Sequence, residues 1–153
     1  MLRISRLTDY ATVILASLAG GNLASAADIA ERTRIGLPTV SKLLKELQHA
    51  GLVLSVRGAR GGYQLARPAG SINAAEIIDA VEGPVALTEC AGGAGQCGIE
   101  STCLVGHGWQ RISHAIRRAL VDVSLEELVR RDGALVAPDF VRLTPTARAP
   151  ARG

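Results

Sequence analysis

Residues 36–66 read GLPTVSKLLKELQHAGLVLSVRGARGGYQLA, and this stretch decides the fold. Apolar residues recur three and four positions apart in its first half, at Val40, Leu43, Leu44 and Leu47. This period predicts an amphipathic helix that Pro38 begins and Gly51 ends. The second half holds two strand-like runs, 52–56 and 63–66, on either side of a glycine-rich basic turn, which predicts a β-hairpin.

The side of this helix opposite its apolar stripe carries hydroxyl and cationic side chains. Such groups reach base edges and phosphates when a helix lies in the major groove of DNA. The hairpin tip presents two arginines among glycines, a combination that favours entry into the negatively charged minor groove next to it. We therefore expect contacts with double-stranded DNA from Thr39, Ser41, Lys42, Lys45, Arg57 and Arg60.

The segments around residues 36–66 complete a winged helix-turn-helix. An apolar period over 7–18 predicts a first helix with Thr8 as its N-cap, and Ser25 to Asp28 forms a capping box that opens a second helix. Beyond the hairpin, the capping box from Asn73 to Glu76 opens a helix over 74–82. The expected fold is mainly α with a small β-hairpin wing, followed by a long C-terminal dimerisation helix.

That long helix is predicted from a second amphipathic period, which runs from Trp109 to Val123. Its apolar stripe is wider than one small domain needs, so it is the natural seam of a homodimer. A further capping box at Ser124 opens a last short helix. The sequence thus divides into a winged helix-turn-helix (1–83), a cysteine-rich loop (84–108), a dimerisation helix with a short terminal helix (109–132) and a flexible tail (133–153).

Charge is distributed unevenly along the 153 residues, although the formal net charge is only +3. Residues 1–67 hold nine Lys and Arg against four acids, whereas residues 68–110 hold five acids and no Lys or Arg. The N-terminal part is therefore expected to meet a polyanion, and the middle of the chain to have a different task.

Several other classes of protein are excluded by what the sequence lacks. The apolar stretch over 11–19 is far shorter than the roughly 20 residues that cross a bilayer, and no signal peptide is visible. We expect a cytoplasmic protein without a membrane partner. No catalytic triad, nucleotide-binding loop or carboxylate pair stands out, so we expect no enzyme activity and no small-molecule substrate.

Three cysteines form a cluster that needs its own explanation. Cys90, Cys97 and Cys103 are spaced C-x6-C-x5-C, and His107 follows four residues after the last. An odd number of cysteines cannot pair fully within one chain, and the short C-x2-4-C knuckles of zinc modules are missing. Long glycine-rich gaps suit a loop that wraps an iron-sulfur cluster. A zinc site and three unliganded thiols remain as alternatives.

Three motifs resemble the Rrf2 family of bacterial transcription factors: LTDYA at 7–11, PTVSK at 38–42 and VRGARGGY at 56–63. Within that family the chain is most similar to regulators of SUF iron-sulfur cluster assembly, relatives of IscR. The segment AVEGPVALTEC at 80–90, which leads into the cysteines, strengthens this likeness. The resemblance covers residues 1–131. It implies a homodimeric repressor of iron-sulfur assembly genes that responds to a bound cluster.

The resemblance also implies three cysteine ligands and one ligand of another type. In IscR-type proteins that ligand is a histidine three residues past the third cysteine, where this chain has Gly106, followed directly by His107. His107 is therefore the expected fourth ligand. Asp9, given by the partner subunit, is the alternative, because related nitric-oxide sensors use an acid in the matching Thr-Asp stretch. A [2Fe–2S] cluster is favoured and a [4Fe–4S] cluster stays open, since the first gap between cysteines is one residue longer than in IscR.

Two other functions stay open beside this one. A regulator without a cluster would respond to redox change or nitric oxide through direct modification of its cysteine thiols. A zinc-stabilised winged helix would bind DNA without sensing anything at the cysteines.

Overall fold

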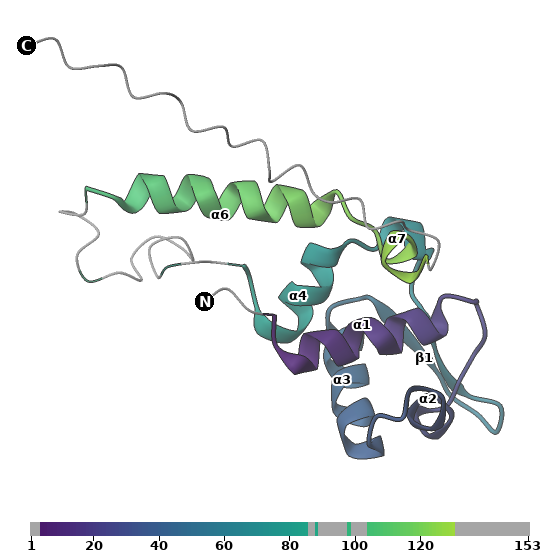
Figure 1. The fold of residues 1–153 in the computed structure, drawn as a ribbon. Coiled ribbons are helices and arrows are strands. Elements are labelled where there is room, and N and C mark those ends of the chain that lie inside the picture. Colours follow the sequence, from purple (N-terminus) through teal and green to yellow (C-terminus); the bar gives the residue numbers. More distant parts are fainter. Residues whose placement is uncertain (1–3, 86–87, 89–97, 99–103, 131–153) are drawn as a thin grey trace, which may run out of the picture.

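The computed structural model describes residues 4–85, 88, 98 and 104–130. The described part is a helical unit with a small hairpin, from which one long helix extends (Figure 1). This arrangement confirms the expected fold class. In chain order the elements are α1 (Arg6–Leu18), α2 (Ala26–Thr33), α3 (Leu37–His49), β1 (Val53–Val56), β2 (Gly62–Leu65), η1 (Ala69–Ser71), α4 (Ala74–Glu82), α6 (Gly106–Val121) and α7 (Leu125–Val129).

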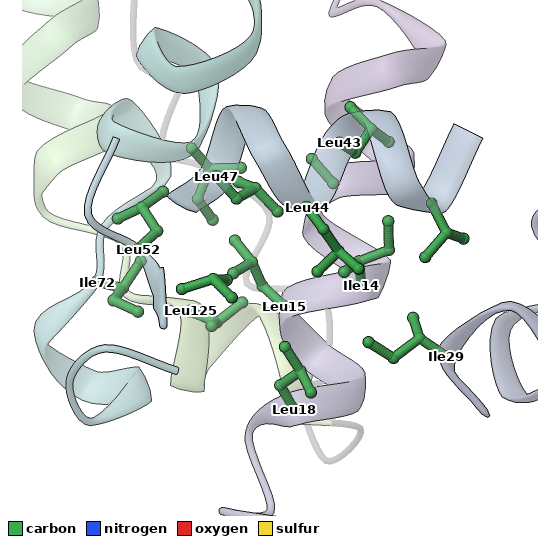
Figure 2. Packing of buried hydrophobic residues seen from close by; sticks show 14 of the residues in the cluster. Ile14, Leu15, Leu18, Ile29, Leu43, Leu44, Leu47, Leu52, Ile72 and Leu125 are labelled. Carbon is green, nitrogen blue, oxygen red and sulfur yellow. The ribbon is translucent and has the colours of Figure 1, made fainter. Parts of the chain in front are cut away.

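One core holds the unit together. It consists mainly of aliphatic side chains, because the chain is only 3% aromatic. Helices α1 and α3 cross at its centre, and α2, α4 and α7 close it from the sides (Figure 2). The largest fully buried side chains are Ile14, Leu15, Leu18, Ile29, Leu43, Leu44, Leu47, Leu52, Ile72, Ile77 and Leu125. The apolar stripe predicted for residues 36–51 is entirely within this core.

The helix starts follow local signals in the sequence. The three predicted capping boxes are present, at Ser25 with Asp28, at Asn73 with Glu76 and at Ser124 with Glu127. The prediction for α1 was wrong: its N-cap is Ser5, whose side chain accepts from the backbone N–H of Thr8. Thr8 lies inside the first turn, with its hydroxyl turned towards the carboxylate of Glu82.

The hairpin is attached to the rest of the unit by a third extended segment. Strands β1 and β2 are antiparallel, with Ser55 opposite Tyr63. The residue before α2, Ala24, exchanges two backbone hydrogen bonds with Tyr63, of 3.1 and 2.7 Å. A Cβ at Gly62 would lie 2.6 Å from the Ala24 carbonyl oxygen, so this close approach requires glycine. The wing is thereby fixed to the helix-turn-helix at its base.

The last helix returns to the N-terminal unit. Leu125 is fully buried in the core, and its N–H donates to the Ile72 carbonyl at 2.7 Å. The predicted division of the chain groups α7 with the dimerisation helix. In the structure, α7 packs instead against α1 and η1 of the N-terminal unit. The boundary at residue 83 stays a prediction. Within the described ranges, no helix is long and apolar enough to cross a membrane.

Candidate nucleic-acid interface

A tight turn between α2 and α3 sets up the predicted recognition helix. Arg34 ends α2 in the left-handed region, with φ 57° and ψ 25°, which is uncommon for a residue other than glycine. Ile35 then turns inward and is buried, and Gly36 caps α3. The turn fixes the start of α3 at the surface of the unit.

The exposed side of α3 carries the predicted DNA-binding groups. Lys42 and Lys45 are exposed, and Thr39 and Ser41 are half-buried at the edges of the same surface. The Nζ of Lys42 lies 3.8 Å from a carboxylate oxygen of Glu46 one turn later. This exposed ion pair contributes little to stability, so Lys42 is available to exchange its carboxylate partner for a phosphate.

One more residue of this surface is not among the six predicted DNA-binding residues. His49 is exposed at the end of α3. It lies on the same side as Lys42 and Lys45, because spacings of three, four and seven residues share one helix face. That spacing is the signal in the sequence that would have found it.

The wing tip brings the remaining two predicted groups to the surface. Arg57 and Arg60 are both exposed, on either side of the turn. Gly58 has φ 124°, and a Cβ at Gly61 would lie 2.3 Å from the Val56 carbonyl oxygen. Only glycine fits these two positions, so the tip combines a tight backbone with two long cationic side chains.

Recognition helix and wing are connected to each other. The Nε2 of Gln48 donates to the Ser55 hydroxyl at 3.3 Å, and α3 packs against β1. The structure therefore brings the six predicted DNA-binding residues together on two adjoining elements.

Helix α6 has 16 residues but buries little of its surface. Ser113 is its one buried residue, whereas Trp109 and Ile112 are 41% and 45% exposed. It begins at Gly106, three residues before the predicted start, and its first half extends beyond the helical unit (Figure 1). The predicted apolar stripe is present and faces away from the chain's own core.

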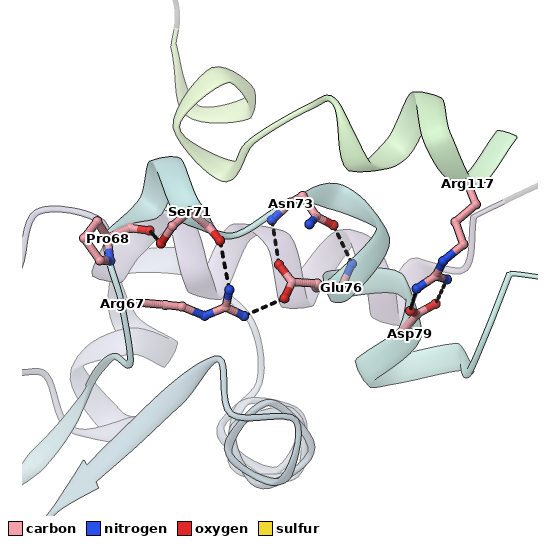
Figure 3. Close-up of polar contacts among 7 residues, drawn as sticks. All are labelled: Arg67, Pro68, Ser71, Asn73, Glu76, Asp79 and Arg117. Carbon is pink, nitrogen blue, oxygen red and sulfur yellow. Dashed lines mark hydrogen bonds and ion pairs between the residues drawn. The ribbon is translucent and has the colours of Figure 1, made fainter. Parts of the chain in front are cut away.

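A bidentate ion pair holds the second half of α6 on α4. The two terminal nitrogens of Arg117 donate to the two carboxylate oxygens of Asp79, at 2.9 and 2.6 Å (Figure 3). These hydrogen bonds and the negative charge of Asp79 raise the pKa of Arg117 above its usual value. On the same helix α4, Glu76 accepts from Arg67 at 2.6 Å. Arginines thus contact α4 in its first turn and in its second half.

A groove of about 930 Å³ lies where the start of α1, the helix α4, the end of α6 and the helix α7 meet. Asp9 and Arg6 are among the polar residues that line it. Most of the lining is apolar: Ile4, Ala74, Ile77, Ile78, Leu120, Val123 and Leu128. It adjoins the exposed stripe of α6, because Leu120 belongs to both and Val123 lies just past the end of the helix.

Residues 4–131 match the Rrf2 family, described as iron-dependent transcriptional regulators. This chain is a member of the Rrf2 family. It is 43% identical to the HTH-type transcriptional regulator IscR of Xenorhabdus nematophila over 126 residues, which cover 80% of this chain and 76% of that protein.

Two solved structures share the fold. The global cysteine regulator CymR of B. subtilis is 32% identical, with a TM-score of 0.64 over 84% of this chain and 97% of that one. IscR of T. potens is 29% identical, with a TM-score of 0.62 over 84% and 86%. The Rrf2 protein described here is therefore an IscR-like DNA-binding transcriptional regulator, and the relatives that it matches are regulators rather than enzymes.

Only some of the predicted cluster ligands of this Rrf2 regulator are among the residues that the structure describes. Cys90, Cys97 and Cys103 lie outside the described residues. His107 is exposed in the first turn of α6, and Asp9 is exposed in the first turn of α1 at the groove. Among the described residues, no group of three or more His, Cys, Asp or Glu side chains is placed to hold a metal ion.

The helix that leads to the cysteines is fastened to α1 at its last residue. A carboxylate oxygen of Glu82 accepts from the backbone N–H of Ser5 at 3.0 Å and from the buried hydroxyl of Thr8. The Thr8 hydroxyl, with the Ser5 N–H, holds the pKa of Glu82 below its usual range, against a smaller opposing effect of burial. These hydrogen bonds attach the end of α4 to the start of α1.

Proposed function

We propose that this Rrf2 regulator represses genes of SUF iron-sulfur cluster assembly and senses the supply of clusters through one bound to Cys90, Cys97 and Cys103. The observation that carries this proposal is the place of the three cysteines in the chain. They lie between α4 and α6, the two helices that adjoin the core of the DNA-binding unit on one side and the exposed apolar stripe on the other. Such a regulator acts in the cytoplasm, where its operator is.

The donor set suits an iron-sulfur cluster. Three thiolates are the ligands that iron-sulfur clusters prefer, and an imidazole replaces thiolate in some two-iron clusters. His107 supports this role because it is exposed on the first turn of α6, four residues past Cys103. Asp9 of the partner subunit stays the alternative fourth ligand. When bound, a [2Fe–2S] cluster supplies a group whose assembly and loss depend on iron and oxidants.

A homodimer follows from the exposed stripe on α6. A twofold axis that passes near Ile116 pairs two α6 helices in antiparallel fashion. Residue 112 then faces residue 120 of the partner subunit, and residue 109 faces residue 123. Because Leu120 and Val123 line the groove, the Trp109 end of each helix reaches the groove of the other chain. Each copy buries the apolar surface that the other exposes.

The chain's own contacts connect the cysteine segment to the recognition helix. Glu82 fastens the end of α4 to α1, and Arg117 fastens α6 to α4. Helix α4 packs on both α1 and α3. A change in cysteine ligation acts on the ends of α4 and α6, and this rigid path carries it to the spacing of the two recognition helices. The result is a shift between two populations that differ in operator affinity.

The experiment that tests this proposal begins with anaerobic purification of the full chain, an absorbance spectrum, and assays for iron, sulfide and zinc. Operator affinity is then measured for the cluster-bound protein, the apoprotein and the variant with Cys90, Cys97 and Cys103 all replaced by alanine. We expect equal amounts of iron and sulfide and at least a tenfold difference in affinity between the first two forms. A protein that binds no iron after reconstitution, or equal affinities, would contradict cluster sensing.

A second function is favoured by the likeness to CymR, which is a global cysteine regulator in B. subtilis. Here the cysteine thiols themselves would respond to oxidation, without a cluster. This reading predicts a colourless protein whose operator affinity changes on treatment with peroxide and recovers on reduction. One bound zinc with no response to either treatment would instead identify a structural metal site.

A further inference from the structure

Leu37 is an exposed apolar side chain at the start of the recognition helix. It is the first residue of α3 and is 46% exposed, and its neighbours in the chain, Gly36 and Pro38, are exposed as well. The hydrophobic contact that commonly fixes a helix start joins the residue before the N-cap to the fourth residue of the helix. Those two positions are Ile35 and Val40, which are 7% and 0% exposed. The folded chain therefore has no evident need for leucine at position 37.

The neighbours of Leu37 are the residues that face DNA. Pro38 is exposed next to it, and Ser41 lies one turn further along the same edge of α3. In helix-turn-helix proteins the N-terminal residues of the recognition helix contact base edges in the major groove. Of the four bases, only thymine presents a methyl group there, and an apolar side chain is its complement.

We propose that Leu37 determines operator sequence by packing its side-chain methyl groups against the 5-methyl group of a thymine in each half-site. The proposal rests on α3 being the recognition helix. The hydroxyls of Thr39 and Ser41 are able to donate to or accept from any base, so they discriminate weakly. An aliphatic contact is satisfied by thymine and leaves a polar edge unsatisfied at the other bases, which makes Leu37 a residue that sets specificity.

The thymine methyl is removable without any other change, because deoxyuridine keeps the pairing and every polar group of thymine. Burial of one methyl is worth about a fourfold change in affinity. A single replacement of the contacted thymine by deoxyuridine should therefore weaken binding about fourfold per half-site. The variant Leu37→Ala should bind the thymine operator about as weakly as the wild-type protein binds the deoxyuridine operator.

The test uses the operator that the full chain selects from random duplex DNA. Each thymine in it is replaced in turn by deoxyuridine, and affinity is measured for the wild-type protein, Leu37→Ala and Leu54→Ala. Leu54 provides a matched control, since it is 48% exposed on β1 and the substitution is the same. We expect one thymine per half-site whose replacement weakens the wild-type protein and Leu54→Ala but leaves Leu37→Ala unchanged.

Two outcomes would overturn the inference. If no thymine methyl matters to the wild-type protein, or if Leu37→Ala loses as much affinity on its removal, Leu37 does not read thymine. Neither result touches cluster sensing, which is measured separately with unmodified operator. A wild-type chain that selects no sequence at all would overturn both this inference and the proposed repressor function. Circular dichroism and thermal unfolding of Leu37→Ala show that the variant is folded.

Discussion

The DNA-binding unit and helix α6 treat their apolar residues in opposite ways. In the unit, the stripe of α3 and most of the stripe of α1 are buried in one core within a single chain. In α6, a stripe of similar strength leaves Trp109 and Ile112 more than two-fifths exposed, and one ion pair to Asp79 provides the polar hold on the unit. The unit is thus complete in one chain, whereas the stripe of α6 would be covered by a second copy in the homodimer proposed above.

The largest expected effect is a loss of stability when a core residue of the DNA-binding unit is truncated. Replacing the fully buried Leu44 with alanine should lower the free energy of unfolding by about 2–5 kcal/mol, because it leaves a cavity where α1 and α3 meet. Urea unfolding followed by circular dichroism measures the loss. The control Leu54→Ala removes the same atoms from an exposed site and should cost less than about 1 kcal/mol. Equal losses in the two variants would mean that the core does not dominate the stability of the unit.

Association through α6 is the next largest effect. Val123→Asp should raise the dimer dissociation constant at least about tenfold, because it places an unpaired carboxylate in each half of the apolar seam. Sedimentation measures the dissociation. Trp109 is the single tryptophan, and its emission should shift to longer wavelength in the same variant.

The emission change has a specific meaning. Within one chain, Val123 is about 20 Å along the helix from Trp109, so the two side chains do not touch. A photo-crosslinker at position 109 should therefore label the partner's groove, around residues 4–12 and 120–128. Arg118→Asp changes charge on another side of α6 and serves as the control. Labelling between the two copies of position 109 would indicate a parallel pair and refute the antiparallel seam.

Arginines in the two regions should differ in what they do for DNA. Arg57→Ala at the wing tip should weaken operator binding about tenfold and reduce the slope of log affinity against log salt by about one. The matched substitution Arg111→Ala on α6 should change neither quantity. Fluorescence anisotropy over a salt series measures both. An unchanged slope for Arg57→Ala would remove the wing from the interface.

The smallest effect concerns the attachment of α4 to α1 at Glu82. Its pKa is lowered in the folded protein, so the contribution to stability is complete above the usual glutamate range and is lost as pH falls through the lowered pKa. Glu82→Gln should therefore reduce stability slightly at neutral pH and flatten its decline between neutral and acidic pH. Thermal unfolding from pH 7 to pH 3 measures this. A parallel decline in both proteins would show that Glu82 does not titrate with folding.

Much of the unit could be predicted because its signals are local. The capping boxes at Ser25, Asn73 and Ser124 fix helix starts within four residues of sequence, and each is found as predicted. The N-cap of α1 was predicted wrongly because Ser5 and Thr8 are both residue types that cap helices, and the cap is the earlier of the two. The packing of Leu125 against Ile72 joins residues that are far apart in the sequence. Short-range periodicity identifies the apolar face of each helix but not the part of the chain that covers this face.

The candidate sites also differ in how far local sequence patterns predict them. The six DNA-binding residues predicted from helix and hairpin patterns lie on adjoining elements in the structure, and their contact with DNA stays a prediction. His49 was missed because a single histidine at a helix end has several ordinary uses. The cysteine ligands and the choice between His107 and Asp9 stay predictions, since the cysteines lie outside the described residues.

The return of α7 to the core has a consequence for the synthesis of this protein on the ribosome. Leu125 completes the packing around Ile72, and the N–H of Ala74 donates to the carbonyl of Val123 at 2.9 Å. The nascent chain lacks these partners until α6 has already been made. Proteins are translated from the N-terminus, so the core of the DNA-binding unit is completed only after the cysteine segment and α6 have been made. A truncated product that ends before residue 124 lacks Leu125 and is left with an open core.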